Sequence, residues 1–77
     1  MENLNDKVYG IIAQTLNIPV ESIGPELGIG MIDQWDSMGN MAVIAALEEQ
    51  LGIEFPIEDL FDLNFVEAII EEIEKIS

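Results

Sequence analysis

Cysteine, histidine and arginine are all absent from this 77-residue chain, whose only basic residues are Lys7 and Lys75. The absence of cysteine excludes a disulfide framework and any cysteine-ligated metal. Without histidine or cysteine the usual proton shuttles and thiol nucleophiles are missing, and a Ser-His-Asp triad cannot be built. A domain this small also has little room for a deep, dry pocket. We therefore expect no catalytic residues, no metal site and no enzyme activity.

Positive charge is so scarce that the formal net charge is −14. Nucleic acids and anionic membranes are bound through basic patches, so neither is an expected partner. The acidity favours partner proteins with basic docking surfaces, although a surface that is merely soluble would carry the same charge. The longest apolar runs are too short to span a bilayer, and residues 1–6 lack the basic start of a signal peptide. These features predict a cytoplasmic protein.

Aromatic residues make up only 6% of the chain, so a core must come mainly from the aliphatic share of its 49% apolar residues. The length fits one domain, residues 1–77. Apolar spacing predicts an all-α fold, a small bundle of three main helices plus one short helix, with a long loop between helices 1 and 2. The first helix ends near Leu16. The second covers residues 37–51, between Asp36 as N-cap and Gly52 as a terminating glycine.

The C-terminal third of the chain carries the remaining helix signals. A short helical turn is expected at residues 57–61, and Asn64 with Glu67 resembles a capping box at the start of the last helix. The apolar stripe of that helix is Val66, Ile69, Ile70, Ile73 and Ile76.

The loop at residues 17–36 is rich in glycine and proline but is not a polar linker. Apolar side chains recur along it, and we expect the loop to lie on the helices and bury them. They are Ile18, Val20, Ile23, Leu27, Ile29, Ile32 and Trp35. A loop of this length usually has a function.

The second helix has more apolar surface than one core requires. One stripe, at core spacing, is Val43, Ile44, Leu47 and Leu51. A second stripe, turned away from the first, is Met38, Met41 and Ala45. Glu48 and Glu49 border the second stripe, where their charge opposes the helix dipole. The second stripe is typical either of an exposed docking patch that suits several partners or of side chains that complete the core beneath the loop.

Asp36-Ser37 stands at the start of this helix. A phosphate on Ser37 would lie near the positive end of the helix dipole, close to free backbone N–H groups. Alone, an Asp-Ser pair at a helix start is usually an ordinary cap.

The stretch IDQWDSMGNMAVIAALEEQLGIEFPIEDL resembles the signature region of acyl carrier proteins and related thiolation domains. In that family an Asp-Ser-Leu or Asp-Ser-Met triplet opens a helix that ends in Glu-Glu, and a segment like LGIEFPIEDL follows. The remaining elements fit as well, so the resemblance covers essentially the whole chain.

The resemblance implies that a phosphopantetheinyl transferase moves 4′-phosphopantetheine from coenzyme A onto Ser37. Asp36 would assist this transfer near the magnesium ion of the transferase. The thiol of the arm would hold acyl groups as thioesters, which explains thioester chemistry in a chain without cysteine. Met38, Met41, Ala45, Glu48 and Glu49 would meet the partner enzymes that transfer or extend the acyl group. A carrier that visits several enzymes is expected to be a monomer.

Some residues depart from the fatty-acid carriers. Gly39 and Ala42 replace residues that are usually acidic, and Trp35, Gly39 and Asn40 look more like specialised carriers. Asp-Ser-Met-Gly is also similar to D-alanyl carrier proteins, so fatty, polyketide, aminoacyl and sugar-modifying cargoes all stay open. An alternative function of a different class is an acidic protein-interaction module that carries no modification. A calcium-binding EF-hand is disfavoured because the aspartates lack the required spacing.

Overall fold

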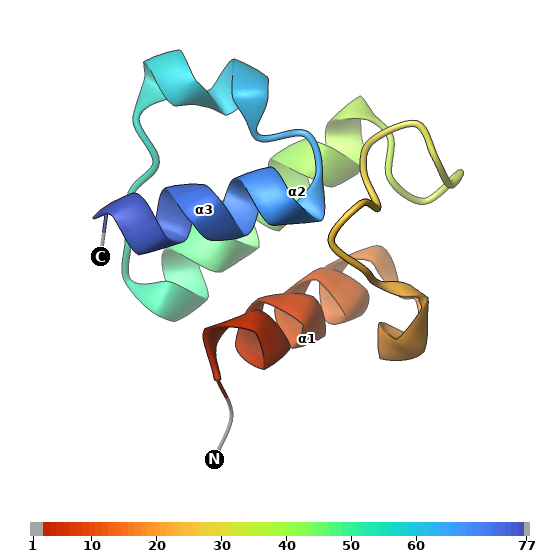
Figure 1. The fold of residues 1–77 in the computed structure, drawn as a ribbon. Coiled ribbons are helices and arrows are strands. Elements are labelled where there is room, and N and C mark those ends of the chain that lie inside the picture. The colour runs from red at the N-terminus through yellow and green to blue at the C-terminus, as the bar shows by residue number, and fades with distance from the viewer. Residues whose placement is uncertain (1–2, 77) are drawn as a thin grey trace.

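The computed structural model describes residues 3–76 and contains three α-helices and two short 3₁₀ helices (Figure 1). The α-helices are α1, Leu4–Leu16; α2, Ser37–Leu51; and α3, Val66–Ile76. The 3₁₀ helices are η1, Val20–Ser22, and η2, Ile57–Asp62. Within residues 3–76 the extended pairing is limited to an isolated antiparallel bridge between Gly28 and Phe65. The predicted all-α bundle is therefore confirmed.

Local signals set the ends of α1 and α2. Asn3 caps α1 by accepting a hydrogen bond from the Asp6 amide at 2.9 Å, and Asn17 ends the helix in the left-handed region with φ of 58°. Gly52 ends α2 in the same way with φ of 67°. The Ile53 amide then donates to the Glu48 carbonyl at 3.2 Å, which completes the predicted Schellman-like ending.

The core lies where the three helices meet. α1 packs chiefly on α2 and also contacts α3 and η1. The inward stripes of the helices fill the centre, and the most buried side chains are Val8, Ile12, Trp35, Val43, Leu47, Val66, Ile69 and Ile73. Of the stripe predicted on α2, Leu51 is only half-buried.

The loop between α1 and α2 lies on the bundle, as predicted, but not all of its apolar residues are covered. Ile23 and Trp35 are buried, and Ile18, Leu27, Ile29 and Ile32 are partly buried against the core. Val20 was expected to be buried and is instead 44% exposed. It lies in η1, a single 3₁₀ turn whose three side chains all face outward.

The start of α3 differs from the predicted capping box. The Val66 amide donates to the Leu27 carbonyl at 2.9 Å, and the Glu67 amide donates to the Pro25 carbonyl at 3.0 Å. Loop carbonyls thus satisfy the first-turn N–H groups that Asn64 was expected to cap. The backbone carbonyl of Asn64 accepts a hydrogen bond from the Ile29 amide at 2.9 Å. The capping-box prediction was wrong because a tertiary contact replaces the local one.

Candidate functional site

Ser37 is the first residue of α2, and its side chain is exposed. Asp36 holds the helix start in place from the preceding position. Its Oδ1 accepts a hydrogen bond from the Gly39 amide at 2.7 Å, and its carbonyl accepts from the Asn40 amide at 2.8 Å. The Ser37 hydroxyl is therefore presented to solvent at a rigid, capped helix N-terminus.

This position suits an attached phosphate better than a catalytic nucleophile. The first-turn N–H groups and the helix dipole favour negative charge on Ser37. The neighbouring carboxylate of Asp36 uses Oδ1 to cap the helix, and the chain has no histidine to act as a base. The hydroxyl can thus accept a group from another enzyme but has no activating partner within the chain.

Trp35 anchors the segment that leads into this helix. Its side chain is completely buried, and its carbonyl accepts a hydrogen bond from the Gly30 amide at 2.8 Å. Its indole Nε1–H donates to Asn40 Oδ1 at 2.9 Å. Asn40 Nδ2 in turn donates to the Leu63 carbonyl at 3.2 Å. These bonds connect the loop, the first turn of α2 and the chain just after η2.

Gly39 has a steric reason to be glycine. A Cβ atom at this position would lie 2.7 Å from the Gln34 carbonyl oxygen and 3.2 Å from a Leu16 methyl group. Distances this short require the backbone to shift. Glycine is a poor helix former in general, but here it permits a close approach between the loop and α2.

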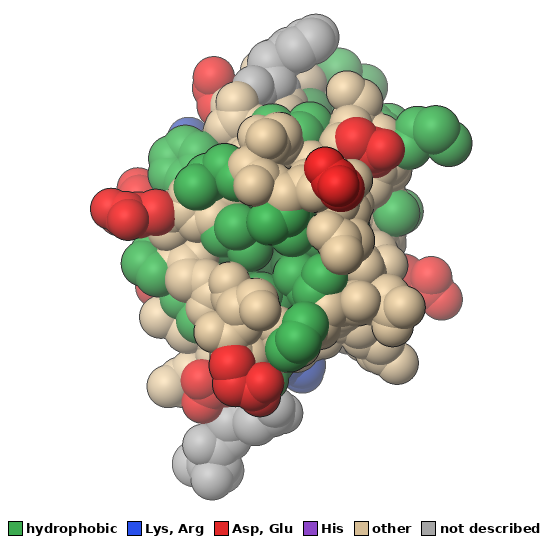
Figure 2. All heavy atoms as spheres, turned by 90° about the vertical axis from the view of Figure 1, so that its right-hand side faces the viewer, with side chains coloured by type: hydrophobic (Ala, Val, Ile, Leu, Met, Phe, Trp, Pro, Cys, Tyr) green, Lys and Arg blue, Asp and Glu red, His purple; other side chains and the backbone are tan. Residues whose placement is uncertain are grey.

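The second stripe of α2 is exposed. Met38 is 82% exposed and Met41 is 65% exposed, and Ala45 is exposed beside them on the same helix. Of the two interpretations left open by the sequence, burial beneath the loop is excluded for these methionines. Figure 2 shows hydrophobic side chains gathered in the middle of one face of the molecule, with carboxylates toward its edges.

The two glutamates that border this stripe differ from each other. Glu49 is exposed, whereas Glu48 is half-buried, and its Oε2 accepts a hydrogen bond from the Phe55 amide at 2.8 Å. Glu48 therefore has an internal role, because it fixes the segment between α2 and η2. No local sequence pattern predicts this bond, because it links residues on either side of a turn.

Ile57 is an exposed apolar residue that no motif in the sequence marks. It opens η2 and is 76% exposed. Together with Glu48 and Phe55 it lines a surface hollow. Its position directly after Pro56, at the start of a short helix, was the available signal that it faces outward.

The comparisons with known proteins identify the family. The family model described as the phosphopantetheine attachment site matches residues 6–73. The chain belongs to the acyl carrier protein family. It is 32% identical to an acyl carrier protein of Thermosynechococcus vestitus over 66 residues, which cover 86% of this chain and 82% of that protein. It is 36% identical to an acyl carrier protein of Buchnera aphidicola over 73 residues, 95% and 92% of the two chains.

A third relative is named as a carrier of D-alanine rather than of acyl groups in general. A D-alanyl carrier protein of Bacillus pumilus is 39% identical over 54 residues, which cover 70% of this chain and 69% of that protein. The family consists of carriers rather than enzymes, and its cofactor is phosphopantetheine. Membership therefore favours a carrier over an unmodified acidic interaction module.

Within residues 3–76, no helix is both long and apolar enough to cross a membrane. In the same part of the chain, no group of three or more Asp or Glu side chains is placed to hold a metal ion.

Proposed function

We propose that Ser37 is the attachment residue for 4′-phosphopantetheine. The observation that carries this proposal is the exposed hydroxyl at the first position of α2, capped by Asp36, within the segment that matches the family. The Ser37 oxygen attacks the phosphorus that bears the pantetheine arm of coenzyme A, and the nucleotide part leaves. The hydroxyl proton passes to a base on the transferase, because this chain offers none.

In this proposal Asp36 has two separate functions. Its Oδ1 caps α2 through the Gly39 amide, which orders the turn that the transferase must recognise. Its carboxylate charge also approaches the magnesium ion of the transferase. The first function requires only an oxygen acceptor, whereas the second requires a negative charge.

The exposed stripe of α2 is proposed as the docking surface for the transferase and for acyl-transferring or synthase enzymes. Met38, Met41 and Ala45 supply an adaptable apolar contact, and Glu49 supplies a charge for basic partner surfaces. Glu48 contributes through its carboxylate and by holding the segment before η2. The carrier is expected to act as a monomer, residues 1–77 as one carrier domain. Its cytoplasmic location stays a prediction.

The cargo of the arm is an acyl group held as a thioester, in fatty-acid-like, polyketide or other specialised biosynthesis. An aminoacyl cargo such as D-alanine is the second candidate. Its support is the 39% identity to a D-alanyl carrier protein and the Asp-Ser-Met-Gly sequence at residues 36–39. Loaded carrier isolated from its source cells and treated with hydroxylamine would release the cargo as a hydroxamate, whose mass distinguishes the two classes.

Intact-mass spectrometry tests the attachment site. The purified chain is incubated with coenzyme A, magnesium and a transferase of broad specificity. The wild type should gain one phosphopantetheine, and Ser37→Ala should gain none. Ser22→Ala is the matched control, because Ser22 is also exposed and lies in a short helical turn. Modification of folded Ser37→Ala, or loss of modification in Ser22→Ala alone, would contradict the proposal.

A further inference from the structure

Glu72 is the only buried charged side chain among the residues that the structure describes. It lies on α3 and is just 8% exposed, and its Oε2 is buried without a conventional hydrogen-bond donor. A buried carboxylate without a donor is costly, because desolvation disfavours the charged form. Such an atom needs a proton or a cation to be stable where it is.

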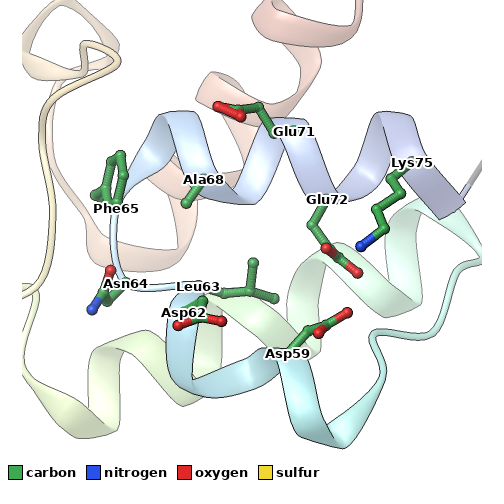
Figure 3. A pocket seen from close by; sticks show the side chains of 9 residues that line it. All are labelled: Asp59, Asp62, Leu63, Asn64, Phe65, Ala68, Glu71, Glu72 and Lys75. Carbon is green, nitrogen blue, oxygen red and sulfur yellow. The ribbon is translucent and has the colours of Figure 1, made fainter.

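The surroundings of Glu72 are mostly acidic. A pocket between η2 and α3 is lined by Asp59 and Asp62 from η2 and by Glu71, Glu72 and Lys75 from α3. Figure 3 shows the carboxyl groups of Asp59 and Glu72 pointing toward each other across this pocket, with the Lys75 side chain beside Glu72. One lysine and four acidic residues thus line the pocket, although the Glu71 side chain points away from η2 (Figure 3).

Two carboxyl groups that point toward each other across a pocket repel when both are ionised. The side chain of Asp59, as a hydrogen-bond partner for the protonated form, raises the pKa of Glu72 above 4.5, its ordinary value, and burial and the Asp59 charge add to the shift. Lys75 opposes this shift, and the Asp62 charge adds to it. A proton on Glu72 would let it donate a hydrogen bond to the Asp59 carboxylate, from α3 to η2, whereas two ionised carboxylates placed this way repel each other.

We propose that a proton on Glu72 bridges it to the Asp59 carboxylate and forms a latch that holds η2 on α3, and that the latch loosens when Glu72 is ionised. The latch goes beyond the carrier function and does not depend on modification of Ser37. Because η2 carries the exposed Ile57, which lines a hollow with Glu48, the latch controls how firmly this apolar side chain is held there.

The sign of the pH effect follows from linkage. A carboxyl group whose pKa is raised in the folded state binds its proton more tightly there than in the unfolded chain. The stability that it contributes is therefore present at pH values below 4.5 and is lost as the pH rises through the raised pKa. Mild acidification from neutral pH should tighten the contact between η2 and α3.

Substitution by glutamine tests the latch without adding or removing bulk. Glu72→Gln places an N–H donor against the Asp59 carboxylate, so it should raise Tm at neutral pH and reduce the dependence of Tm on pH above 4.5. Glu74→Gln is the matched control, because Glu74 is an exposed residue of the same helix and the charge change is the same. The control should raise Tm less and leave the pH dependence as in the wild type.

A second measurement, an NMR titration, gives its main result on the wild type and so does not depend on a variant that folds. The Glu72 carboxyl carbon, followed by NMR in the wild type, should titrate with a midpoint above 4.5. The midpoint should fall in Asp59→Asn, whose amide donates to the Glu72 carboxylate. The proposal requires both results. Equal Tm changes for Glu72→Gln and Glu74→Gln would overturn it, and so would a Glu72 midpoint that is ordinary in the wild type or unmoved in Asp59→Asn.

Discussion

The indole N–H of Trp35 donates a hydrogen bond to the Oδ1 atom of Asn40 at 2.9 Å, so the residue two positions before Ser37 is tied to the first turn of α2. Asn40 extends the connection to the Leu63 carbonyl through Nδ2. Trp35 is completely buried, and buried polar groups are costly when a partner is lost. The start of α2 is therefore held by a buried side-chain network in addition to its cap.

Trp35→Phe should destabilise the fold by about 1–3 kcal/mol, because it removes the N–H donor and leaves Asn40 Oδ1 without its partner. The lost ring volume also contributes, so the hydrogen bond must be isolated by a double-mutant cycle. Denaturant unfolding of Trp35→Phe, Asn40→Ala and the double variant should give a coupling free energy of about 0.5 kcal/mol or more. Strictly additive effects would show that the bond contributes nothing beyond packing.

How far the sequence predicts this site depends on whether a signal is local. The bounds of α2 follow from Asp36 and Gly52, since caps act within a few residues. The Trp35–Asn40 bond and the internal bond of Glu48 depend on how separate segments meet. At the start of α3 a reasonable local signal, Asn64 with Glu67, is overridden because loop carbonyls reach the same N–H groups.

Glu72 shows another limit of the sequence. Glu72 lies between Ile69 and Ile73 in a helix with several other glutamates. Nothing in the adjacent residues distinguishes Glu72 from the glutamates that face solvent. Glu72 is buried where η2 brings Asp59 over that part of α3 (Figure 3). A charged residue at the edge of an apolar stripe is therefore ambiguous until the packing is known.

Gly39→Ala should destabilise the fold although alanine is the better helix former. Helix propensity alone predicts a gain of about 1 kcal/mol, but the new Cβ atom would lie 2.7 Å from the Gln34 carbonyl oxygen. Gly10→Ala in α1 is the control, because no atom lies within 4 Å of its added Cβ, and it should stabilise by roughly 0.5–1 kcal/mol. Thermal or urea unfolding would measure both. Higher stability in both variants would mean that the loop moves away from the new Cβ atom without destabilising the fold.

Asp36→Asn and Asp36→Ala should separate helix capping from phosphopantetheine transfer. Asparagine retains an oxygen for the Gly39 amide, so its stability should stay near that of the wild type, whereas alanine should lose about 0.5–2 kcal/mol. Both variants lack the charge that the proposal assigns to transfer, so both should be modified more slowly. Unfolding curves and timed intact-mass measurements give the two quantities. Normal modification of Asp36→Asn would restrict Asp36 to capping.

Glu48→Ala and Glu49→Ala should differ in stability despite the same change in charge. Glu48→Ala leaves the Phe55 amide without the acceptor that lies 2.8 Å away, and we expect a loss of about 1–3 kcal/mol. Glu49 is exposed, so Glu49→Ala should change stability by less than about 0.5 kcal/mol and act mainly on partner binding. Denaturant unfolding would decide. Equal, small losses would place Glu48 on the docking surface alone.

Salt should raise the melting temperature of this carrier. With a formal charge of −14, the folded chain concentrates like charges in a small volume, and this repulsion destabilises the compact state. At about 0.1 M ionic strength the Debye length is only about 10 Å, so most surface repulsion is screened. Calorimetry across a series of sodium chloride concentrations should therefore show Tm rising and then levelling. Millimolar magnesium should act at a lower concentration because of its double charge. A Tm that is indifferent to both salts would mean that repulsion does not limit the stability of this fold.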